Sequence, residues 1–282
     1  MAILYIENNT TVHCEIIESL LLKYRNLLGN IDVHQIVIHI PRPGPTVFES
    51  YIRAKYPAVK FGKLSKYTYY IGVTLYPDDY KMIVNLNPST HVYISHRIAP
   101  TIYNEAKNIF YLTPLSPYNV LSADILPYAE QKRPATHPIY IVQGSIERRD
   151  MGLLKRILEG VYTGQHSSYK IKILGKDAAI PPELQKYSEK LIVCKNYNWE
   201  KYHREFLDGY CILPLISKMT HPQYYTTTLT STINYAKGYR LKCLIDRDLQ
   251  EIYNLDDVEV FGDETDICVA FQRTLNDFGA PL

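Results

Sequence analysis

The sequence contains few cysteines, and no two of them are spaced as a pair. The 282-residue chain has five, with no Cys-x-x-Cys motif, so neither a disulfide framework nor a zinc knuckle is expected. Several lie inside apolar runs, which predicts reduced residues of the core and a cytosolic compartment. The five are Cys14, Cys194, Cys211, Cys243 and Cys268, and the three in clear apolar runs are Cys194, Cys211 and Cys243.

Long apolar runs and a large excess of one charge are also absent. There is no uninterrupted apolar stretch of about 18 residues, and the start, MAILYIE, lacks the basic flank of a signal peptide. We therefore expect a soluble protein that has no membrane span and is not secreted. The 31 basic and 29 acidic residues leave a net charge of +2, which argues against a nucleic-acid binder. With 46% hydrophobic residues, the chain can form about two domains of ordinary size.

A third absence concerns dinucleotide binding. After the first expected strand the chain reads ENNTT, with no Gly-x-Gly-x-x-Gly to bring the backbone onto a pyrophosphate. A nucleotide-sugar oxidoreductase or epimerase would nevertheless share the α/β pattern described next. Its Tyr-x-x-x-Lys signature occurs twice, as Tyr51/Lys55 and Tyr197/Lys201, so this class stays an alternative that NAD binding would favour.

Short apolar runs alternate with longer amphipathic segments, the pattern of repeated βα units and a parallel sheet. We predict an α/β fold with two Rossmann-like domains. Prolines between residues 115 and 138 mark the connection, which gives domains over residues 1–133 and 134–282. The expected strands are residues 2–6, 33–40, 67–75, 81–84, 91–95, 109–112, 138–142, 169–174, 191–194, 210–215, 241–245 and 258–261, and the expected helices include residues 12–28, 47–56, 150–159, 199–207, 249–253 and 265–277.

The most informative segment is rich in hydroxyl groups and runs from the strand at residues 210–215 into a helix. Six Thr or Ser residues lie between positions 226 and 232. Because a helix start has backbone N–H groups without helical partners, it suits a phosphate group when hydroxyls lie beside it. We expect Ser231 and Thr232 to contact phosphate, with Thr230 and Tyr235 next. The alternative is a hydroxyl that only caps the helix.

The order of a strand, the residues GSIERRD at positions 144–150, a helix and a strand ending at Gly175 resembles the C-terminal domain of GT-B-fold glycosyltransferases. The resemblance implies a domain that binds a sugar nucleotide. Gly144 would allow close approach, and Arg148 and Arg149 would meet the diphosphate through the paired bonds that a guanidinium forms with phosphate. A solvated helix start is the alternative for the two arginines.

The same resemblance extends to a helix start in the middle of the C-terminal half. The residues Asn198 and Trp199 follow a strand, where members of the family often hold the nucleobase. The resemblance implies that Trp199, or the adjacent Tyr197, stacks on the base while the amides read its edge. A helix cap or a hydrophobic staple is the competing interpretation.

The resemblance also bears on the mechanism, because retaining members commonly carry an acidic pair flanking the hydroxyl-rich loop. Residues 217–237 contain no Asp or Glu, which favours an inverting enzyme with a general base from the other domain. No metal is required if arginine, hydroxyls and a helix start neutralise the leaving group. The base is expected at the carboxyl ends of the N-terminal strands, facing a central cleft. The candidates are Asp79, Asp78, His13, Glu7 and His96, each of which also has a structural alternative.

Two other functions remain open from the sequence. Asp246 and Asp248 have the Asp-x-Asp spacing that holds Mn²⁺ or Mg²⁺ in GT-A glycosyltransferases, although their position before a short helix fits a helix cap better. A catalytically silent sugar-binding or partner-binding module is the other possibility, because no nucleophile or base is uniquely marked. Activity that survives EDTA would exclude the metal enzyme, and hydrolysis of a sugar nucleotide would exclude the silent module.

The compact length, the 26 tyrosines and the run TSTINYAKGYRLKCLIDRDLQEIYNL are similar to small glycosyltransferases encoded by large algal DNA viruses of the chlorovirus type. This resemblance implies a glycan acceptor that belongs to a capsid protein and is built in the host cytoplasm. It also implies a UDP-sugar donor, with UDP-xylose as a reasonable choice. The sequence does not identify the acceptor, the linkage or the oligomeric state.

Overall fold

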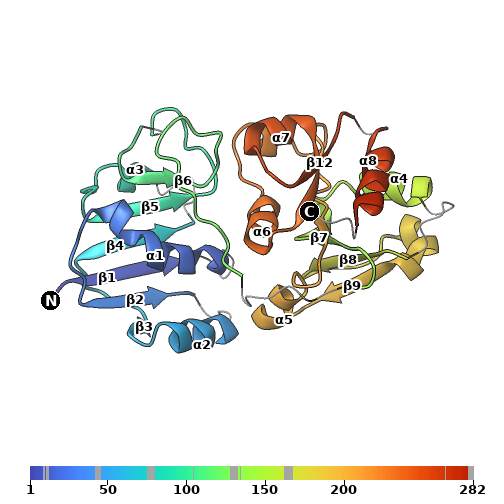
Figure 1. The fold of residues 1–282 in the computed structure, drawn as a ribbon. Helices are drawn as coiled ribbons and strands as arrows, with labels where there is room; N and C mark the ends of the chain where they lie inside the picture. Colours follow the sequence, from blue (N-terminus) through green and yellow to red (C-terminus); the bar gives the residue numbers. More distant parts are fainter. Residues whose placement is uncertain are drawn as a thin grey trace. The chain divides into compact units, whose positions relative to one another are not determined.

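The computed structural model describes residues 1–8, 10, 13–41, 46–74, 80–103, 105–127, 133, 135–161, 168–263 and 265–278 (Figure 1). The chain forms two compact units: unit 1 comprises Met1–Leu126 and Thr226–Leu229, and unit 2 comprises Pro127–Tyr225 and Thr230–Leu282. The sequence places the division between residues 133 and 134, whereas the contacts place it after Leu126. The segment Thr226–Leu229, which we call the strap, belongs to unit 1 although it lies far along the chain.

Unit 1 is built around a six-stranded sheet of order β3-β2-β1-β4-β5-β6, in which every strand pair is parallel. In the centre, Ile6 of β1 pairs with Ile38 of β2 and with Ile71 of β4. The edge strand β3 was not expected from the sequence. The elements are β1 (Ile3–Asn8), α1 (Ile17–Leu28), β2 (Gln35–His39), α2 (Thr46–Lys55), β3 (Val59–Phe61), β4 (Tyr69–Val73), α3 (Tyr80–Ile83), β5 (His91–Ser95) and β6 (Ile109–Tyr111).

The expected strand at residues 81–84 is instead the helix α3, so this prediction was wrong. Tyr80 and Ile83 are buried in one hydrophobic cluster, while Met82 between them is 67% exposed. A spacing of three residues brings two side chains to one face only in a helix. The side chain of Asn108 donates to the carbonyl of Ile83 (2.6 Å) and so satisfies an acceptor at the helix end. A short apolar run does not distinguish the two structures by periodicity.

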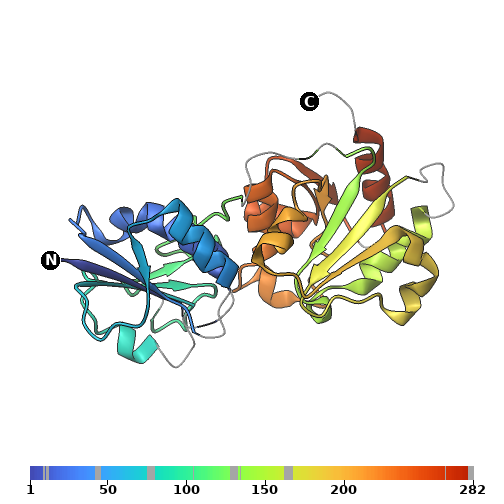
Figure 2. The same cartoon turned by 90° about the horizontal axis from the view of Figure 1, so that it is seen from below.

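Unit 2 repeats the architecture of unit 1, with a parallel sheet of order β12-β11-β10-β7-β8-β9. Figure 2 shows the strands of each sheet fanning out with the twist expected of parallel sheets. The elements are β7 (Ile139–Gln143), α4 (Met151–Val161), β8 (Lys170–Gly175), β9 (Leu191–Lys195), α5 (Trp199–Arg204), β10 (Cys211–Ile212), α6 (Ser231–Tyr239), β11 (Lys242–Asp246), α7 (Arg247–Tyr253), β12 (Val258–Phe261) and α8 (Ile267–Asp277).

The core of unit 2 lies between its sheet and the helices α4 and α8, which pack side by side (Figure 1). The ring of Tyr140 of β7 packs against that of Phe271 of α8 with centroids 4.2 Å apart, and its hydroxyl lies 2.8 Å from Thr274 Oγ1. Cys194, Cys211 and Cys243 are free and buried, which confirms the prediction of reduced core residues for these three.

The strand order of each sheet locates where a ligand would bind. From β1 the chain proceeds to β2 on one side and β4 lies on the other, and β7 has the same relation to β8 and β10. Open α/β sheets bind ligands outside the carboxyl ends of such a pair of strands.

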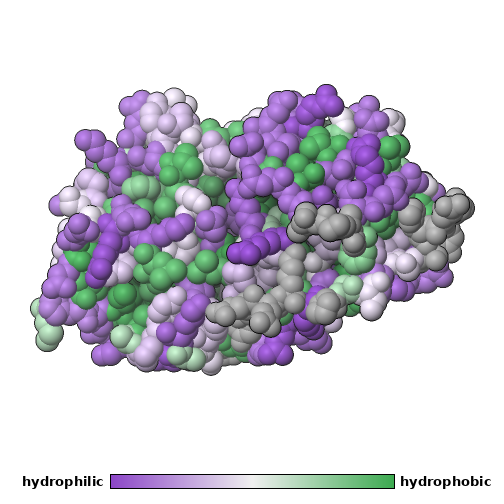
Figure 3. Space-filling view, in the orientation of Figure 1, coloured by the Kyte–Doolittle hydropathy of each residue, from purple (hydrophilic) through white to green (hydrophobic). Residues whose placement is uncertain are grey.

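Over the face seen in Figure 3, hydrophobic side chains lie in small groups among hydrophilic ones. No helix among the described residues is both long and apolar enough to cross a membrane.

Candidate functional site

Two glycines bring the loop after β7 close to the neighbouring strand. Gly144 has φ +106, and a Cβ there would lie 2.6 Å from Nη2 of Arg149. The N–H of Gly144 donates to the carbonyl of Leu174 (2.9 Å), and a Cβ on Gly175 would collide with the carbonyl oxygen of Gly144. Any side chain at these positions would therefore move the loop that we expect to approach the donor.

The guanidinium of Arg149 is buried behind this loop. It donates to the carbonyl of Gln143 (2.8 Å from Nε), to the carbonyl of Arg148 (2.8 Å) and to Oγ1 of Thr232 (3.0 Å). Thr232, which is fully buried, donates in turn to Oε1 of Gln143 (3.0 Å). Burial lowers the pKa of Arg149 below its usual value. These bonds join the loop after β7 to the first turn of α6. The neighbouring arginine, Arg148, is exposed.

A second network holds the loop that follows β10. One oxygen of Asp150 accepts from the amides of the first turn of α4, and the other accepts from the hydroxyls of Ser217 (2.8 Å) and Thr220 (3.2 Å). Oγ1 of Thr220 lies 2.7 Å from Nδ1 of His221. Burial, with the charge of Arg149, lowers the pKa of His221. His221 was not expected from the sequence, although it lies within the segment that we singled out.

The hydroxyl-rich helix is α6, and it begins at Ser231, within the run of Thr and Ser residues. Thr230 is its N-cap but makes no capping bond through its side chain, and its N–H donates to the hydroxyl of Tyr253 (3.3 Å). Ser231 is the first helical residue and is partly exposed, whereas Thr232 is engaged by Arg149. The first amides of a helix have no carbonyl four residues before them, so this turn is the favourable place for an anion.

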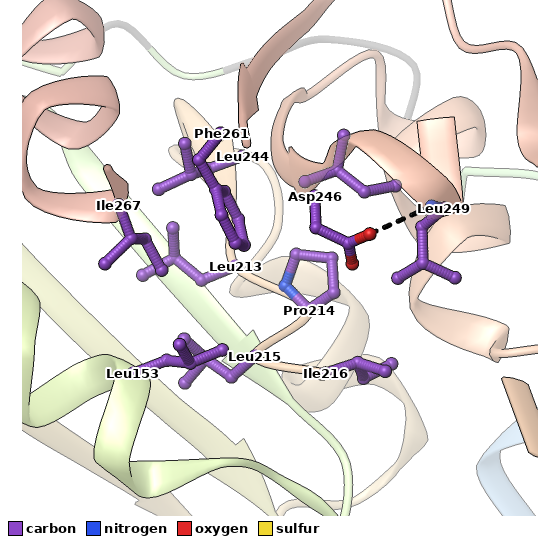
Figure 4. A pocket seen from close by; sticks show the side chains of 11 residues that line it. Leu153, Leu213, Pro214, Leu215, Ile216, Leu244, Asp246, Leu249, Phe261 and Ile267 are labelled. Atoms are coloured by element: carbon purple, nitrogen blue, oxygen red, sulfur yellow. Dashed lines mark hydrogen bonds between the residues drawn. The ribbon is translucent and has the colours of Figure 1, made fainter. Parts of the chain in front are cut away.

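A pocket of about 260 Å³ opens at the carboxyl ends of β10, β11 and β12. Figure 4 shows an adjoining, much smaller cavity of about 10 Å³, which shares Leu153 and Phe261 with this pocket and is lined mainly by apolar side chains, Leu213 after β10 among them. The carboxyl of Asp246 lies among them. The polar residues of the wider pocket are Ser217, Lys218, Tyr225, Asp246, Asp248 and Asp263.

The two carboxylates of the Asp-x-Asp motif have different partners. Asp246 caps α7 by accepting from the amide of Leu249 (3.0 Å, dashed in Figure 4), which confirms the helix-cap interpretation. It also accepts from the hydroxyl of Tyr225, and burial raises its pKa. Asp248 is exposed and pairs with Lys218 (2.9 Å). Among the described residues, no group of three or more His, Cys, Asp or Glu side chains is placed to hold a metal ion.

The carboxyl ends of β1 and β5 in unit 1 carry a cluster of His13, Glu15 and His96. His13 adopts a left-handed backbone (φ 63), its Nδ1 lies 3.4 Å from Oε1 of Glu15, and its ring centroid is 4.0 Å from that of His96. Nε2 of His96 is buried and has no hydrogen-bond partner among the described residues. An imidazole nitrogen buried without a partner is costly, so it marks a place where a ligand or water would be bound.

Burial and charge act differently on the members of this cluster. Burial, reinforced by the charge of His13, lowers the pKa of His96 to about 3, so its imidazole is neutral near pH 7. Burial acts to raise the pKa of Glu15, but its hydrogen bond to His13 and the charge of that residue outweigh this effect and lower the pKa. Glu15 was missed in the sequence because one acidic residue at a helix start is an ordinary feature.

Among the other predicted bases, only Glu7 lies in the part of the chain that the structure describes, and it has partners outside this cluster. The carboxylate of Glu7 accepts from the hydroxyls of Tyr70 (2.9 Å) and Tyr5 (3.4 Å), residues of the tyrosine-rich cluster in unit 1. Asp78 and Asp79 lie outside the described residues. Of the three candidate bases that the structure describes, His13 and His96 lie together.

The residues expected at the nucleobase have structural partners. The side chain of Asn198 caps α5 by accepting from the amide of Lys201 (2.9 Å), so the helix-cap interpretation is confirmed. The half-buried ring of Trp199 lies 4.1 Å from that of His203, and buried Tyr235 stacks on Phe206 at 4.7 Å. Whether Trp199 or Tyr235 also contacts a nucleotide stays a prediction.

Neither Tyr-x-x-x-Lys match is arranged for proton transfer. The hydroxyl of Tyr51 accepts from Lys55 (3.2 Å), but both side chains are bound by the buried carboxylate of Glu18, at 2.9 and 2.8 Å. Burial raises the pKa of Tyr51. Burial likewise raises the pKa of Tyr197 to about 12, and Nζ of Lys201 lies over its ring, 3.9 Å from the centroid. A proton-transfer group works best with a pKa near the working pH, so these shifts are unfavourable.

Comparison with known proteins identifies the fold. No family model and no curated protein matches the chain. Among solved structures, it is similar to AviGT4, a glycosyltransferase involved in avilamycin A biosynthesis, with 14% identity and a TM-score of 0.60 over 99% of this chain and 89% of that one. It is also similar to a putative UDP-N-acetylglucosamine 2-epimerase from Listeria monocytogenes, with 9% identity and a TM-score of 0.55 over the same shares. The predicted GT-B-like fold of two parallel-sheet α/β domains is thereby confirmed.

Proposed function

We propose that the protein is a glycosyltransferase that moves a sugar from a nucleoside diphosphate sugar to a hydroxyl of a glycan acceptor. The observation that carries the proposal is the first turn of α6, which Arg149 holds beside the loop after β7 at the carboxyl edge of its sheet. A helix start and serine and threonine hydroxyls in this place suit a diphosphate. The similarity in fold to a glycosyltransferase over nearly the whole chain supports this assignment.

In this proposal, unit 2 binds the donor. The amides of Ser231 and Thr232 and the hydroxyl of Ser231 receive the diphosphate, and exposed Arg148 adds a positive charge. Arg149 acts from behind the loop, because its own donors are used within the protein. The pocket of about 260 Å³ has the size of a small ligand group and offers Ser217, Lys218 and Asp248 to sugar hydroxyls. UDP is the proposed nucleotide, and xylose is one sugar that such a pocket could hold.

Unit 1 supplies the general base, and we assign that role to His13. Glu15 accepts from Nδ1–H of His13, which leaves the lone pair on Nε2 to accept a proton. His96 is the poorer base because its pKa is about 3. His13 takes the proton of the acceptor hydroxyl, and the oxygen bonds to the anomeric carbon. The bond from that carbon to the diphosphate breaks, and its electrons leave with the nucleoside diphosphate. The product has inverted configuration.

Helix amides, hydroxyls and Arg148 would neutralise the leaving group without a metal. Asp246 supports this view, because its carboxylate is committed to Leu249 and Tyr225. We expect turnover to survive an excess of EDTA. Loss of activity with EDTA, and recovery with Mn²⁺ or Mg²⁺ alone, would instead favour the metal-dependent alternative through Asp246 and Asp248.

The experiment is calorimetric titration with UDP, GDP and TDP, followed by assay of the matching sugar nucleotides. We expect one nucleoside diphosphate, UDP, to bind, and its sugar conjugates to be slowly hydrolysed even without an acceptor. Nuclear magnetic resonance of the released sugar gives the configuration, which should be inverted at the anomeric carbon. Absence of binding by all three nucleotides would contradict the proposal.

A nucleotide-sugar epimerase is the second candidate, and the similarity to the putative Listeria epimerase favours it. Incubation with UDP-N-acetylglucosamine distinguishes the two functions. An epimerase forms a new sugar epimer, whereas a transferase forms UDP or no product. The viral origin and the location in a host cytoplasm come from the sequence resemblance alone and stay predictions.

A further inference from the structure

The strap, Thr226–Leu229, adds a short antiparallel pairing to unit 1 directly beside the histidine cluster. Thr228 forms an isolated bridge with Arg97. The N–H of Leu229 donates to the carbonyl of His96 (3.0 Å), and the N–H of Ile98 donates to the carbonyl of Thr227 (2.9 Å). These two bonds fix the backbone on both sides of Arg97. They therefore fix the direction of the His96 side chain, whose ring lies against His13.

The chain on either side of the strap is held within unit 2 by tyrosine hydroxyls. Just before it, Tyr225 donates to the carbonyl of Ile216 (3.2 Å). Just after it, the N–H of Thr230 donates to the hydroxyl of Tyr253 (3.3 Å), and Thr230 is the N-cap of α6. One residue thus separates the amide that holds His96 from the first turn of α6. An anion bound at this turn also acts on the strap, because one residue joins the two and peptide geometry is stiff.

We propose that the strap is a positioning element for the His13–Glu15–His96 cluster and that it transmits nucleotide binding at α6 to that cluster. This inference rests on the proposed function, because it takes the first turn of α6 as the diphosphate site. Such coupling requires a contact at each end of the strap that differs between the free and the nucleotide-bound protein. At one end this contact is the bond from Leu229 to His96, and at the other it is the set of amides in the first turn of α6. The side chain of His96 then acts through His13, whose ring it contacts.

The test uses nuclear magnetic resonance to measure how UDP changes the chemical shifts of the histidine ring protons in the full chain. Signals of His13 and His96 are assigned with His13→Gln and His96→Gln. The key variant is Leu229→Pro, which lacks the N–H that donates to His96. Thr228→Pro is its matched control, because Thr228 occupies the bridge position that lies between the two hydrogen bonds. Leu229→Ala controls for the lost side chain while keeping the N–H.

We expect UDP to shift the His13 and His96 signals in the wild type, in Thr228→Pro and in Leu229→Ala. In Leu229→Pro, UDP should still bind, while the shifts of the His13 and His96 signals should be largely lost, because the contact that couples the two sites is gone. Two results would overturn this inference and leave the proposed function standing. One is that UDP binds to Leu229→Pro and shifts the histidine signals as much as in the wild type, and the other is that UDP binds to the wild type without shifting them. Failure of the wild type to bind UDP, GDP or TDP would contradict the proposed function as well.

Discussion

The polar clusters at the carboxyl edges of the two sheets are completed in different ways. In unit 2, Arg149, Gln143 and Thr232 donate to and accept from one another, so a buried charge is satisfied within the protein. In unit 1, Nε2 of His96 is buried without a partner among the described residues. His13 and Arg149 both follow the central strand of their sheet, β1 and β7, whereas the second member of each cluster comes from a different position, His96 after β5 and Thr232 in the helix after β10.

This comparison indicates which groups hold a shape and which are available for chemistry. A saturated network in a low-dielectric setting is rigid and keeps its geometry before a ligand arrives. An imidazole left without a hydrogen bond costs about 1–3 kcal/mol, which a fold tolerates where the group has another use. We therefore expect substitutions in unit 1 to act on turnover and substitutions in unit 2 to act on stability and binding.

The largest expected effect is on turnover, from His13→Gln. Removal of a general base lowers kcat by about 10²–10⁴-fold, while UDP affinity should stay within about twofold of the wild type. Rates of donor consumption at saturating substrate, with calorimetry for UDP, measure the two quantities. Glu15→Gln keeps the ring of His13 and removes only the charge beside it, so turnover should fall by less than in His13→Gln. Unchanged turnover in His13→Gln would end the assignment of this base.

Arg149→Met should have the next largest effect and should act on stability. The change leaves the carbonyl of Gln143 and the hydroxyl of Thr232 without a buried donor, so the free energy of unfolding should fall by about 3 kcal/mol. Arg148→Met is the matched control, because Arg148 is the adjacent arginine and is exposed, and it should change stability by less than about 0.5 kcal/mol. Urea denaturation measures both. Equal effects in the two variants would contradict the rigid role of the network.

The titration of His96 provides a pH-dependent test. Its pKa is about 3 in the folded protein, against an ordinary value of 6.5. Between these values the unfolded chain binds a proton that the folded chain does not, so stability falls as the pH drops below 6.5. Between pH 7 and pH 5, His96 should therefore lower the free energy of unfolding by about 2 kcal/mol. The variant His96→Gln should lack that part of the pH dependence. Urea titrations at the two pH values measure it, and equal slopes for both proteins would refute the prediction.

The smallest expected effect concerns the Asp-x-Asp motif of unit 2. Asp246→Ala removes the cap of α7 and the acceptor of the Tyr225 hydroxyl, so it should lower stability by about 1 kcal/mol. Asp248→Ala removes an exposed ion pair and should change stability by less than about 0.5 kcal/mol. Thermal denaturation of the two variants compares them. A larger loss in Asp248→Ala would mean that the motif has a role other than capping.

Local patterns in the sequence predicted most of the fold. Alternating apolar runs predicted two α/β domains, and the hydroxyl-rich segment predicted that a loop becomes a helix among its hydroxyl residues, where α6 begins at Ser231. The pairing of Thr228 with Arg97 was not predictable. The two residues are 131 positions apart, and nothing in the sequence around either one indicates that their backbones meet. For the same reason, the return of the strap to unit 1 was not predicted from the sequence.

The candidate site was only partly predictable, since partners decide what a side chain can do. Arg149 and Arg148 read alike in the sequence, yet one is buried in a network and the other is exposed. The helix cap was the competing interpretation for Asn198 and the better fit for Asp246, and the sequence could indicate both because a cap depends on residues three positions away. The contact between His13 and His96 depends instead on two strands meeting at one edge, and it required the structure.

The central claim, that the first turn of α6 receives a diphosphate, is tested most directly by hydrogen–deuterium exchange with and without saturating UDP. We predict that UDP slows exchange in the peptides that cover the first turn of α6 and the loop after β7. Slowed exchange in unit 1 alone, or UDP binding that leaves α6 unprotected, would contradict the claim.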